Sequence, residues 1–492
     1  MSSENSNRQD QETGPPQHVG VPEQEPGTLQ GTVVLRVDGL AAGGRGVGRL
    51  SGEVWFVEGA MPGDLVRASP VRRHRRHVEA LAVAIVEPSA ARRTPPCPIQ
   101  GLCGGCPWMP LHEPAQREWK MRLLRNALER IGRVPTPAVD PVRTPSASLG
   151  YRNRVEFTVR CGGGRPARVG LHAASGRALV DVERCLLQDD AANAVLSTAR
   201  EFFAEALVRR GPRVELRLAI RRAERGGGML VALRETGQPF RAAEALARFL
   251  AGRHPLLTGV VLLRGAPGRR GGTRTRVLAG RDRLEEGIGS FHLELPAASF
   301  AQVSAAGAEE LLRLVADLAM PVSGRSAIDL YGGVGLFGME LARRGASPVT
   351  VCDADADAIA GGRRAAAAAG LAAVRHEHAD AARFLAERSG TVPDVLVANP
   401  PRSGLGPGVA RAILTLGPAR LILVSCDPAT LARDLGILAR EGAYRVERLV
   451  PLDLFPQTAH LETVALLGRT LTEWVPPQAP PGGPRPRAPG SG

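Results

Sequence analysis

Cys426 stands where a nucleophile would be expected. It follows the apolar run LILVS, which is typical of a buried strand, and precedes Asp427-Pro428, a pair that favours the first turn of a helix. A thiol at a helix N-terminus is expected to ionise more readily, because the helix dipole stabilises a thiolate. A free cysteine at a strand end is also commonly a core residue. Covalent catalysis at Cys426 therefore requires a partner base elsewhere in the chain.

Glu462 is the candidate for that base. It closes the segment FPQTAHLE (455–462), which leads into a final apolar strand, VALL. A chain that enters the last strand in this way can return to the edge of the sheet at which Cys426 lies. The alternative is an exposed carboxylate at a strand end, without a catalytic role.

A glycine-rich turn is the candidate cofactor site. Gly333, Gly335 and Gly338 form G-x-G-x-x-G after the strand SAIDLY (326–331), and Asp353 ends the next strand. Glycine lets a backbone approach a ligand closely, and the Asp353 carboxylate can accept hydrogen bonds from both ribose hydroxyls of an adenosine. Dinucleotides and S-adenosylmethionine use the same geometry, and a glycine turn without a ligand has the same pattern.

The segment Asn399-Pro400-Pro401-Arg402 follows the strand VLVA and is predicted to form a stiff lip beside the ligand crevice. Enzymes that methylate exocyclic amines carry an aromatic residue after Asn-Pro-Pro, so an arginine here argues against amine chemistry. No further part of a nicotinamide site is visible. Together the motifs favour S-adenosylmethionine over a dinucleotide. A plain proline-stiffened turn is the alternative.

Three of the seven cysteines, Cys97, Cys103 and Cys106, lie within ten residues of one another. An odd number of cysteines in a large chain without an apolar signal region argues against a disulfide framework. The cluster of three instead predicts metal or iron–sulfur ligands. Spacing alone favours an iron–sulfur cluster and a four-cysteine zinc site equally.

The charge of the chain indicates a polyanionic partner, for which nucleic acid is the obvious candidate. The formal net charge is +14, with 63 basic and 49 acidic residues. Lys120 is the only lysine, which is the mark of a GC-rich genome, but such bias does not explain the excess of basic residues. No membrane span or signal region is apparent, so we expect a cytoplasmic protein. No obligate protein partner is inferred.

The elements that must position these residues predict an α/β protein with three folded parts. Residues 29–90 have the short strands and glycine turns of a small OB-like barrel, with Trp55, Phe56 and the basic run 72–76 as candidate RNA contacts. A solvated basic turn is the alternative for that run. Residues 91–295 are expected to form a central α+β RNA-binding domain, and 296–470 a Rossmann-like parallel sheet covered on both faces. The ends, 1–28 and 471–492, are expected to be disordered.

Residues 30–467 resemble the family of RNA uracil-5 methyltransferases, above all in the segments SCDPATLARDL and FPQTAHLETV. The resemblance implies that Cys426 adds to carbon 6 of uracil, so that carbon 5 can take a methyl group, and that Glu462 removes the proton from carbon 5. It also implies S-adenosylmethionine contacts at a further set of residues. These are Gln302, Tyr331, Asp353 and Asn399, to which the glycine pattern adds Gly333 and Gly335.

The same resemblance implies a [4Fe–4S] cluster and an RNA-binding barrel of the TRAM type at residues 30–90. The cluster ligands would be Cys97, Cys103, Cys106 and Cys185. Asn-Pro-Pro-Arg and Leu336 resemble the branch that methylates 23S ribosomal RNA, although that branch commonly lacks the barrel, so a transfer RNA target stays open. Asp427 replaces the asparagine that often follows the nucleophile.

Two other classes of protein share part of these features. A radical methylthiotransferase would require three cysteines spaced C-x3-C-x2-C, whereas the first gap here is five residues. An RNA-binding or assembly protein with an inactive methyltransferase domain would not need both Cys426 and Glu462. Both residues are present, so the sequence favours the enzyme.

Overall fold

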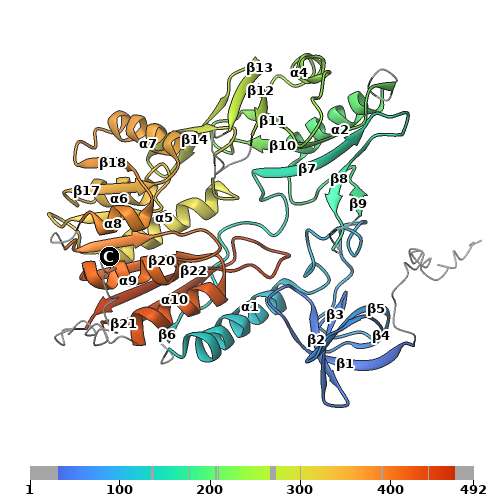
Figure 1. Ribbon diagram of the computed structural model, residues 1–492, viewed down its shortest axis with the longest axis horizontal. Coiled ribbons are helices and arrows are strands. Elements are labelled where there is room, and N and C mark those ends of the chain that lie inside the picture. The colour runs from blue at the N-terminus through green and yellow to red at the C-terminus, as the bar shows by residue number, and fades with distance from the viewer. Residues whose placement is uncertain are drawn as a thin grey trace, which may run out of the picture.

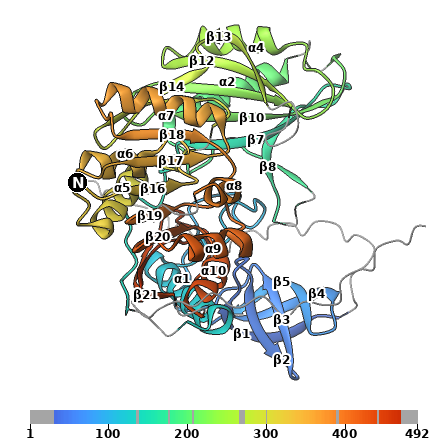
Figure 2. The ribbon, with the colours of Figure 1, turned by 60° about the vertical axis from the view of Figure 1, so that its left-hand side comes forward.

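The computed structural model describes residues 31–470 with short gaps. The gaps are residues 135–137, 175, 177, 206, 207, 209, 266–272, 300, 389–391, 441 and 442. The terminal segments predicted to be disordered, 1–28 and 471–492, lie outside the described residues. Figure 1 shows the barrel, the central sheet and the C-terminal sheet as three separate parts, and the turned view in Figure 2 agrees.

A closed five-stranded barrel forms the N-terminal part, as predicted. Its strands are β1 (Val33–Leu40), β2 (Gly46–Leu50), β3 (Glu53–Glu58), β4 (Leu65–Arg73) and β5 (His77–Glu87), in the order β1-β2-β3-β5-β4. Trp55 and Val57 point into the barrel and are almost fully buried, because alternate residues of β3 face inward. The prediction that Trp55 contacts RNA is therefore wrong. Phe56, on the opposite face of the strand, is half-buried.

Helix α1 (Glu113–Ala127) connects the barrel region to the C-terminal sheet. It begins with a proline in its first turn and runs into one turn of π-helix, η1 (Leu128–Gly132). Its buried face carries Gln116, Lys120 and Leu124. Both α1 and η1 pack against α10 (Pro428–Arg440), the helix that follows Cys426.

The central part is a seven-stranded sheet of order β13-β12-β11-β10-β7-β8-β9. Its strands are β7 (Arg154–Cys161), β8 (Arg168–His172), β9 (Leu179–Asp181), β10 (Val214–Arg222), β11 (Met229–Glu235), β12 (Leu257–Arg264) and β13 (Arg274–Gly280). Helices α2 (Asp190–Ala204) and α4 (Ala243–Ala251) bury Phe203 and Leu246 against it. The hairpin β14 (Arg283–Ile288) and β15 (Phe291–Pro296) leads to the next part.

The C-terminal part is an eight-stranded sheet of order β18-β17-β16-β19-β20-β22-β21-β6. The strands are β16 (Ala327–Leu330), β17 (Val349–Asp353), β18 (Val374–His378), β19 (Val395–Ala398), β20 (Arg420–Ser425), β21 (Tyr444–Leu452), β22 (Glu462–Arg469) and the short β6 (Ala138–Val139). Strand β22 runs antiparallel to both neighbours, so the expectation of a purely parallel sheet is corrected. Strand β21 ends at the carboxyl edge, and β22 begins there and runs back.

Helices cover both faces of this sheet, as predicted. One face packs against α5 (Ala305–Ala319), α6 (Leu336–Arg343) and α7 (Ala356–Ala368). The other packs against α8 (Ala381–Ala386), α9 (Gly406–Leu416), α10 and α1. Each face of the sheet has its own apolar core. The two cores hold the strands in place, and with them the edge of the sheet that carries the candidate site. Within the described residues, no helix has the length and apolar character needed to cross a membrane.

Candidate functional site

The carboxyl edge of the C-terminal sheet carries both the candidate nucleophile and the glycine turn. Strands β16, β19 and β20 are neighbours and parallel, so the residues that follow them emerge at one edge. Those residues are the turn beginning at Tyr331, the Asn-Pro-Pro segment beginning at Asn399, and Cys426. Ligands of such sheets bind at this edge.

Cys426 and Glu462 are brought together by the strand register. Ser425 of β20 pairs with Thr463 of the antiparallel strand β22. Cys426 directly follows Ser425, and Glu462 directly precedes Thr463, so the register places Cys426 opposite Glu462. The Glu462 carboxylate is close enough to raise the pKa of the Cys426 thiol electrostatically. Two residues that are far apart in the sequence are thus neighbours at the edge of the sheet.

The pKa of the Cys426 thiol is raised, first by burial and then by Glu462. The guanidinium of Arg402 acts in the opposite direction. Burial and the neighbouring carboxylate thus act against the thiolate that a helix N-terminus favours. Cys426 is half-buried.

Glu462 is almost completely buried, with 3% of its surface exposed, and is not the exposed strand-end carboxylate of the alternative interpretation. Burial raises its pKa to about 7, although Arg402 opposes the shift. A carboxylate with a pKa near neutrality exchanges protons readily at physiological pH, as a general base must.

Asp427 caps helix α10, as the sequence predicts. Its carboxylate accepts a hydrogen bond from the Thr430 backbone N–H at 2.8 Å. The Asp427 backbone N–H in turn donates to the Ser425 hydroxyl at 3.3 Å. The turn that holds Cys426 is thereby fixed on both sides.

The glycine turn between β16 and α6 requires glycine at one position above all. Gly335 has a φ of 86°, and a Cβ there would lie 2.8 Å from both Nε2 of His376 and Cγ2 of Val351. Gly333 also has a positive φ, and its N–H donates to Oδ2 of Asp353 at 2.8 Å. The carboxylate at the end of β17 is thus joined directly to the glycine turn.

Two of the other predicted cofactor residues, Tyr331 and Asn399, lie at the same edge. Tyr331 begins the turn with a φ of 59°, and Asn399 ties the end of β19 to β16 through an N–H donated to the Leu330 carbonyl at 3.2 Å. Gln302 precedes α5 and is half-buried, and its carbonyl accepts a hydrogen bond from Asn153 at 3.0 Å. The structure thus holds Gln302 beside the central part of the chain.

Asp329 is a buried carboxyl beside the glycine turn that sequence reasoning missed. It is fully buried in β16, and burial raises the pKa of its carboxyl to about 7. One oxygen accepts a hydrogen bond from the Gly338 N–H at 2.9 Å, while the other has no partner within the described residues. The sequence did contain one sign of this residue, because Asp329 is the single acidic residue within the apolar strand AIDL.

The four predicted metal ligands line one cavity of about 450 Å³, together with Arg152 and Arg154. They are Cys97, Cys103, Cys106 and Cys185. Burial, followed by charge repulsion from Cys185 and Cys103, raises the pKa of the Cys106 thiol to about 12. None of the four forms a disulfide. Half-buried thiols that would repel one another as thiolates suit a cation that would hold them together.

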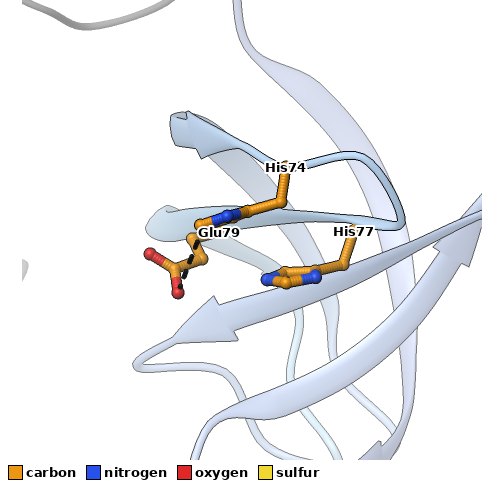
Figure 3. Close-up of side chains that lie close together, drawn as sticks. All are labelled: His74, His77 and Glu79. Carbon is orange, nitrogen blue, oxygen red and sulfur yellow. Dashed lines mark ion pairs between the residues drawn. The ribbon is translucent and has the colours of Figure 1, made fainter. Parts of the chain in front are cut away.

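The hairpin between β4 and β5 carries a second cluster of possible metal ligands, His74, His77 and Glu79 (Figure 3), whose ligand atoms lie within 4.8 Å of one another. The two imidazole rings are stacked, with centroids 4.3 Å apart. Arg45 already pairs with Glu79 at 3.1 Å. Since Arg75 and Arg76 are exposed in the same turn, this surface attracts anions more than a metal cation.

Comparisons with known proteins agree on one family. A family model described as tRNA (Uracil-5-)-methyltransferase matches residues 275–470. A relative from Gloeobacter violaceus, described as an uncharacterized RNA methyltransferase, is 36% identical over 475 residues, which are 92% of this chain and 100% of the relative. A second, from Nitratidesulfovibrio vulgaris and similarly described, is 35% identical and covers 89% of this chain and 96% of its own length.

A solved structure has the same fold. It is the Pyrococcus abyssi tRNA (uracil-54, C5)-methyltransferase in complex with S-adenosyl-L-homocysteine. The match has a TM-score of 0.65 and 24% sequence identity, and covers 89% of this chain and 100% of that chain. The α/β fold predicted from the sequence is confirmed.

Proposed function

Because the chain belongs to the family of S-adenosylmethionine-dependent RNA uracil-5 methyltransferases, we propose that it methylates carbon 5 of a uridine through a covalent bond to Cys426. The observation that carries this proposal is the strand register that sets Cys426 beside the buried carboxyl of Glu462. A nucleophile and a base side by side at a ligand-binding edge are what a two-step covalent reaction requires.

Cys426 begins the reaction. Its thiolate forms a bond to carbon 6 of the uracil, and the electrons of the carbon 5–carbon 6 double bond move onto the oxygen at carbon 4. S-adenosylmethionine supplies the methyl group, which carbon 5 takes as the sulfonium becomes a thioether. Arg402 favours the thiolate, since it lowers the pKa that burial and Glu462 raise.

Glu462 completes the reaction. Its carboxylate takes the proton from carbon 5, and the electron pair restores the double bond to carbon 6. As that double bond forms, the bond from carbon 6 to sulfur breaks, and Cys426 leaves as a thiolate. Since carbon 6 is hidden in stacked RNA, the target base must first be flipped into the site.

The residues proposed to bind S-adenosylmethionine border the glycine turn. Asp353 accepts from the ribose hydroxyls, while Gly333 and Gly335 allow the backbone to approach the ligand. The remaining contacts proposed from the family pattern are Gln302, Tyr331 and Asn399.

Replacement of Cys426 tests the mechanism. Cys426→Ala should lower turnover by at least ~1,000-fold, because the covalent step is lost, and should leave S-adenosylmethionine affinity unchanged. Cys161→Ala is the matched control, because Cys161 is buried in the central sheet and distant in sequence from the site. Methylation by Cys426→Ala at the wild-type rate would refute the proposal.

The proposed target is 23S ribosomal RNA, on the strength of the Asn-Pro-Pro-Arg segment at 399–402 and of Leu336. A transfer RNA uridine is the second candidate, because the matching family model and the Pyrococcus abyssi structure are both described as transfer RNA enzymes. Mapping of 5-methyluridine in both RNA classes, from cells with and without the gene, distinguishes them. Loss from transfer RNA alone would exclude the ribosomal target.

The four-cysteine cavity is proposed to hold a [4Fe–4S] cluster, which would supply a structural or RNA-orienting anchor, since methyl transfer moves no electrons. Four thiolate ligands are what such a cluster needs. Anaerobic purification should yield iron and acid-labile sulfide, both lost in Cys106→Ser and retained in Cys161→Ser. Stoichiometric zinc without iron would identify a zinc site instead.

A further inference from the structure

The loop that delivers Glu462 is held from inside the protein. Residues 453–461, here called the base loop, connect β21 to β22 and end directly before Glu462. Although it is a loop, Asp453, Gln457 and Thr458 are almost completely buried. Gln457 also has a φ of 70°, which is unusual for a residue other than glycine. A buried polar loop needs internal partners for its hydrogen-bonding groups.

Gln116 of α1 supplies the first of these partners through a reciprocal pair of hydrogen bonds. Its side-chain amide donates to Oε1 of Gln457 at 2.9 Å, and its own Oε1 accepts from the Gln457 backbone N–H at 3.0 Å. Arg93 donates to the same Oε1 of Gln457 at 3.0 Å, and the Trp108 N–H donates to the Gln457 carbonyl at 3.0 Å. Gln457 is thereby fixed in both side chain and backbone.

Lys120 supplies the second anchor, one helical turn further along α1. Its ammonium pairs with Asp453 at 2.5 Å and donates to the Phe455 carbonyl at 3.1 Å. The side chain is fully buried, and it is the only lysine in a chain that uses arginine at every other basic position.

We propose that Gln116 and Lys120 are positioning residues for methyl transfer, which hold the base loop so that the Glu462 carboxyl stays beside Cys426. This inference rests on the proposed catalytic roles of Cys426 and Glu462. Neither Gln116 nor Lys120 belongs to the proposed catalytic or cofactor-binding set. They act through Gln457 and Asp453, from a helix that lies more than 300 residues earlier in the sequence.

A loosened base loop should slow one step more than the others. Addition of the Cys426 sulfur and transfer of the methyl group do not use Glu462. Removal of the carbon 5 proton does, and the sulfur cannot leave until that proton is gone. The covalent RNA–protein adduct should therefore accumulate, whereas simple loss of folded protein would lower the adduct and the product together.

The experiment measures turnover, S-adenosylmethionine affinity and the denatured adduct in Gln116→Leu and in the milder Lys120→Arg. We expect kcat to fall about 10- to 100-fold, as for a misplacement of about 1 Å. The affinity should stay within about twofold, and the adduct band should exceed that of the wild type. Lys120→Arg keeps the positive charge. If Gln116→Leu fails to fold, this second variant still tests the inference.

Leu246→Ala is the matched control. It removes a fully buried side chain from the central core, away from the base loop, and should lower stability without accumulation of adduct. An unchanged kcat in both α1 variants, or a lower kcat without extra adduct, would overturn the inference. Glu462→Gln is run alongside them. If it traps adduct and the α1 variants do not, only the inference fails; if it traps none, the proposed role of Glu462 fails first.

Discussion

At the scale of single residues, the site combines two groups whose charged forms are disfavoured. Burial raises the pKa of both Cys426 and Glu462. The negative charges of Glu462 and Asp427 raise the pKa of the Cys426 thiol further. Arg402 is the positive group that opposes both shifts. The unliganded site therefore favours a neutral thiol, and substrate binding must supply part of the stabilisation that the thiolate needs.

Replacement of Glu462 by glutamine should raise stability in alkaline solution. The folded-state pKa of about 7 lies above the ordinary value of 4.5, so the wild type loses stability as the pH rises between these values. A neutral amide avoids that loss, and the variant should gain about 3 kcal/mol relative to wild type between pH 4.5 and pH 8. Thermal unfolding at both pH values measures it. A constant difference between the two proteins would show that Glu462 is not destabilised by burial.

At the scale of elements, the glycine turn is the proposed site of S-adenosylmethionine binding, and its backbone geometry should set the affinity. Gly335→Ala should weaken S-adenosylmethionine binding at least about tenfold, because the added methyl must displace His376 and Val351 in addition to straining a positive φ. Calorimetric titration measures the affinity. Gly370→Ala is the control, since it has a φ of 69° but open space around the Cβ. Equal affinity in both variants would contradict this account of the turn.

Much of the element pattern could be predicted from the sequence. Local signals sufficed for the five-stranded barrel, the strand before Cys426 and the Asp427 cap, because alternation, apolar runs and capping residues act over a few positions. Features that depend on tertiary burial could not be predicted. These include the inward face of Trp55, the raised pKa of Cys426 and the buried carboxyl of Asp329. In each case, neighbours distant in sequence decide the outcome.

At the scale of the whole molecule, the barrel is proposed to bind RNA phosphates with the exposed arginines of the β4–β5 turn. The net charge of +14 supports association with a polyanion, and Arg75 and Arg76 project from the turn. The barrel is a separate part of the fold, as Figure 2 shows, so this contact is independent of the glycine turn. RNA affinity and methyl-donor affinity should therefore respond to different substitutions.

Arg75→Ala combined with Arg76→Ala should weaken RNA binding and reduce the slope of log affinity against log salt by ~2, one for each lost phosphate contact. S-adenosylmethionine affinity should be unchanged. Arg445→Ala, which removes an exposed arginine from β21, is the control. Binding isotherms at several salt concentrations make the comparison. An unaltered slope would mean that the turn is only a solvated basic surface.

The central claim is that Cys426 forms a bond to the uracil during methyl transfer. The most direct measurement uses RNA that carries 5-fluorouridine, because a base can remove a proton from carbon 5 but not fluorine as a cation. After reaction with S-adenosylmethionine, mass spectrometry of the digested wild-type protein should find a methylated fluorouracil nucleotide attached to Cys426. An adduct on another cysteine, or turnover of ordinary RNA with no adduct on the fluorinated RNA, would contradict the claim.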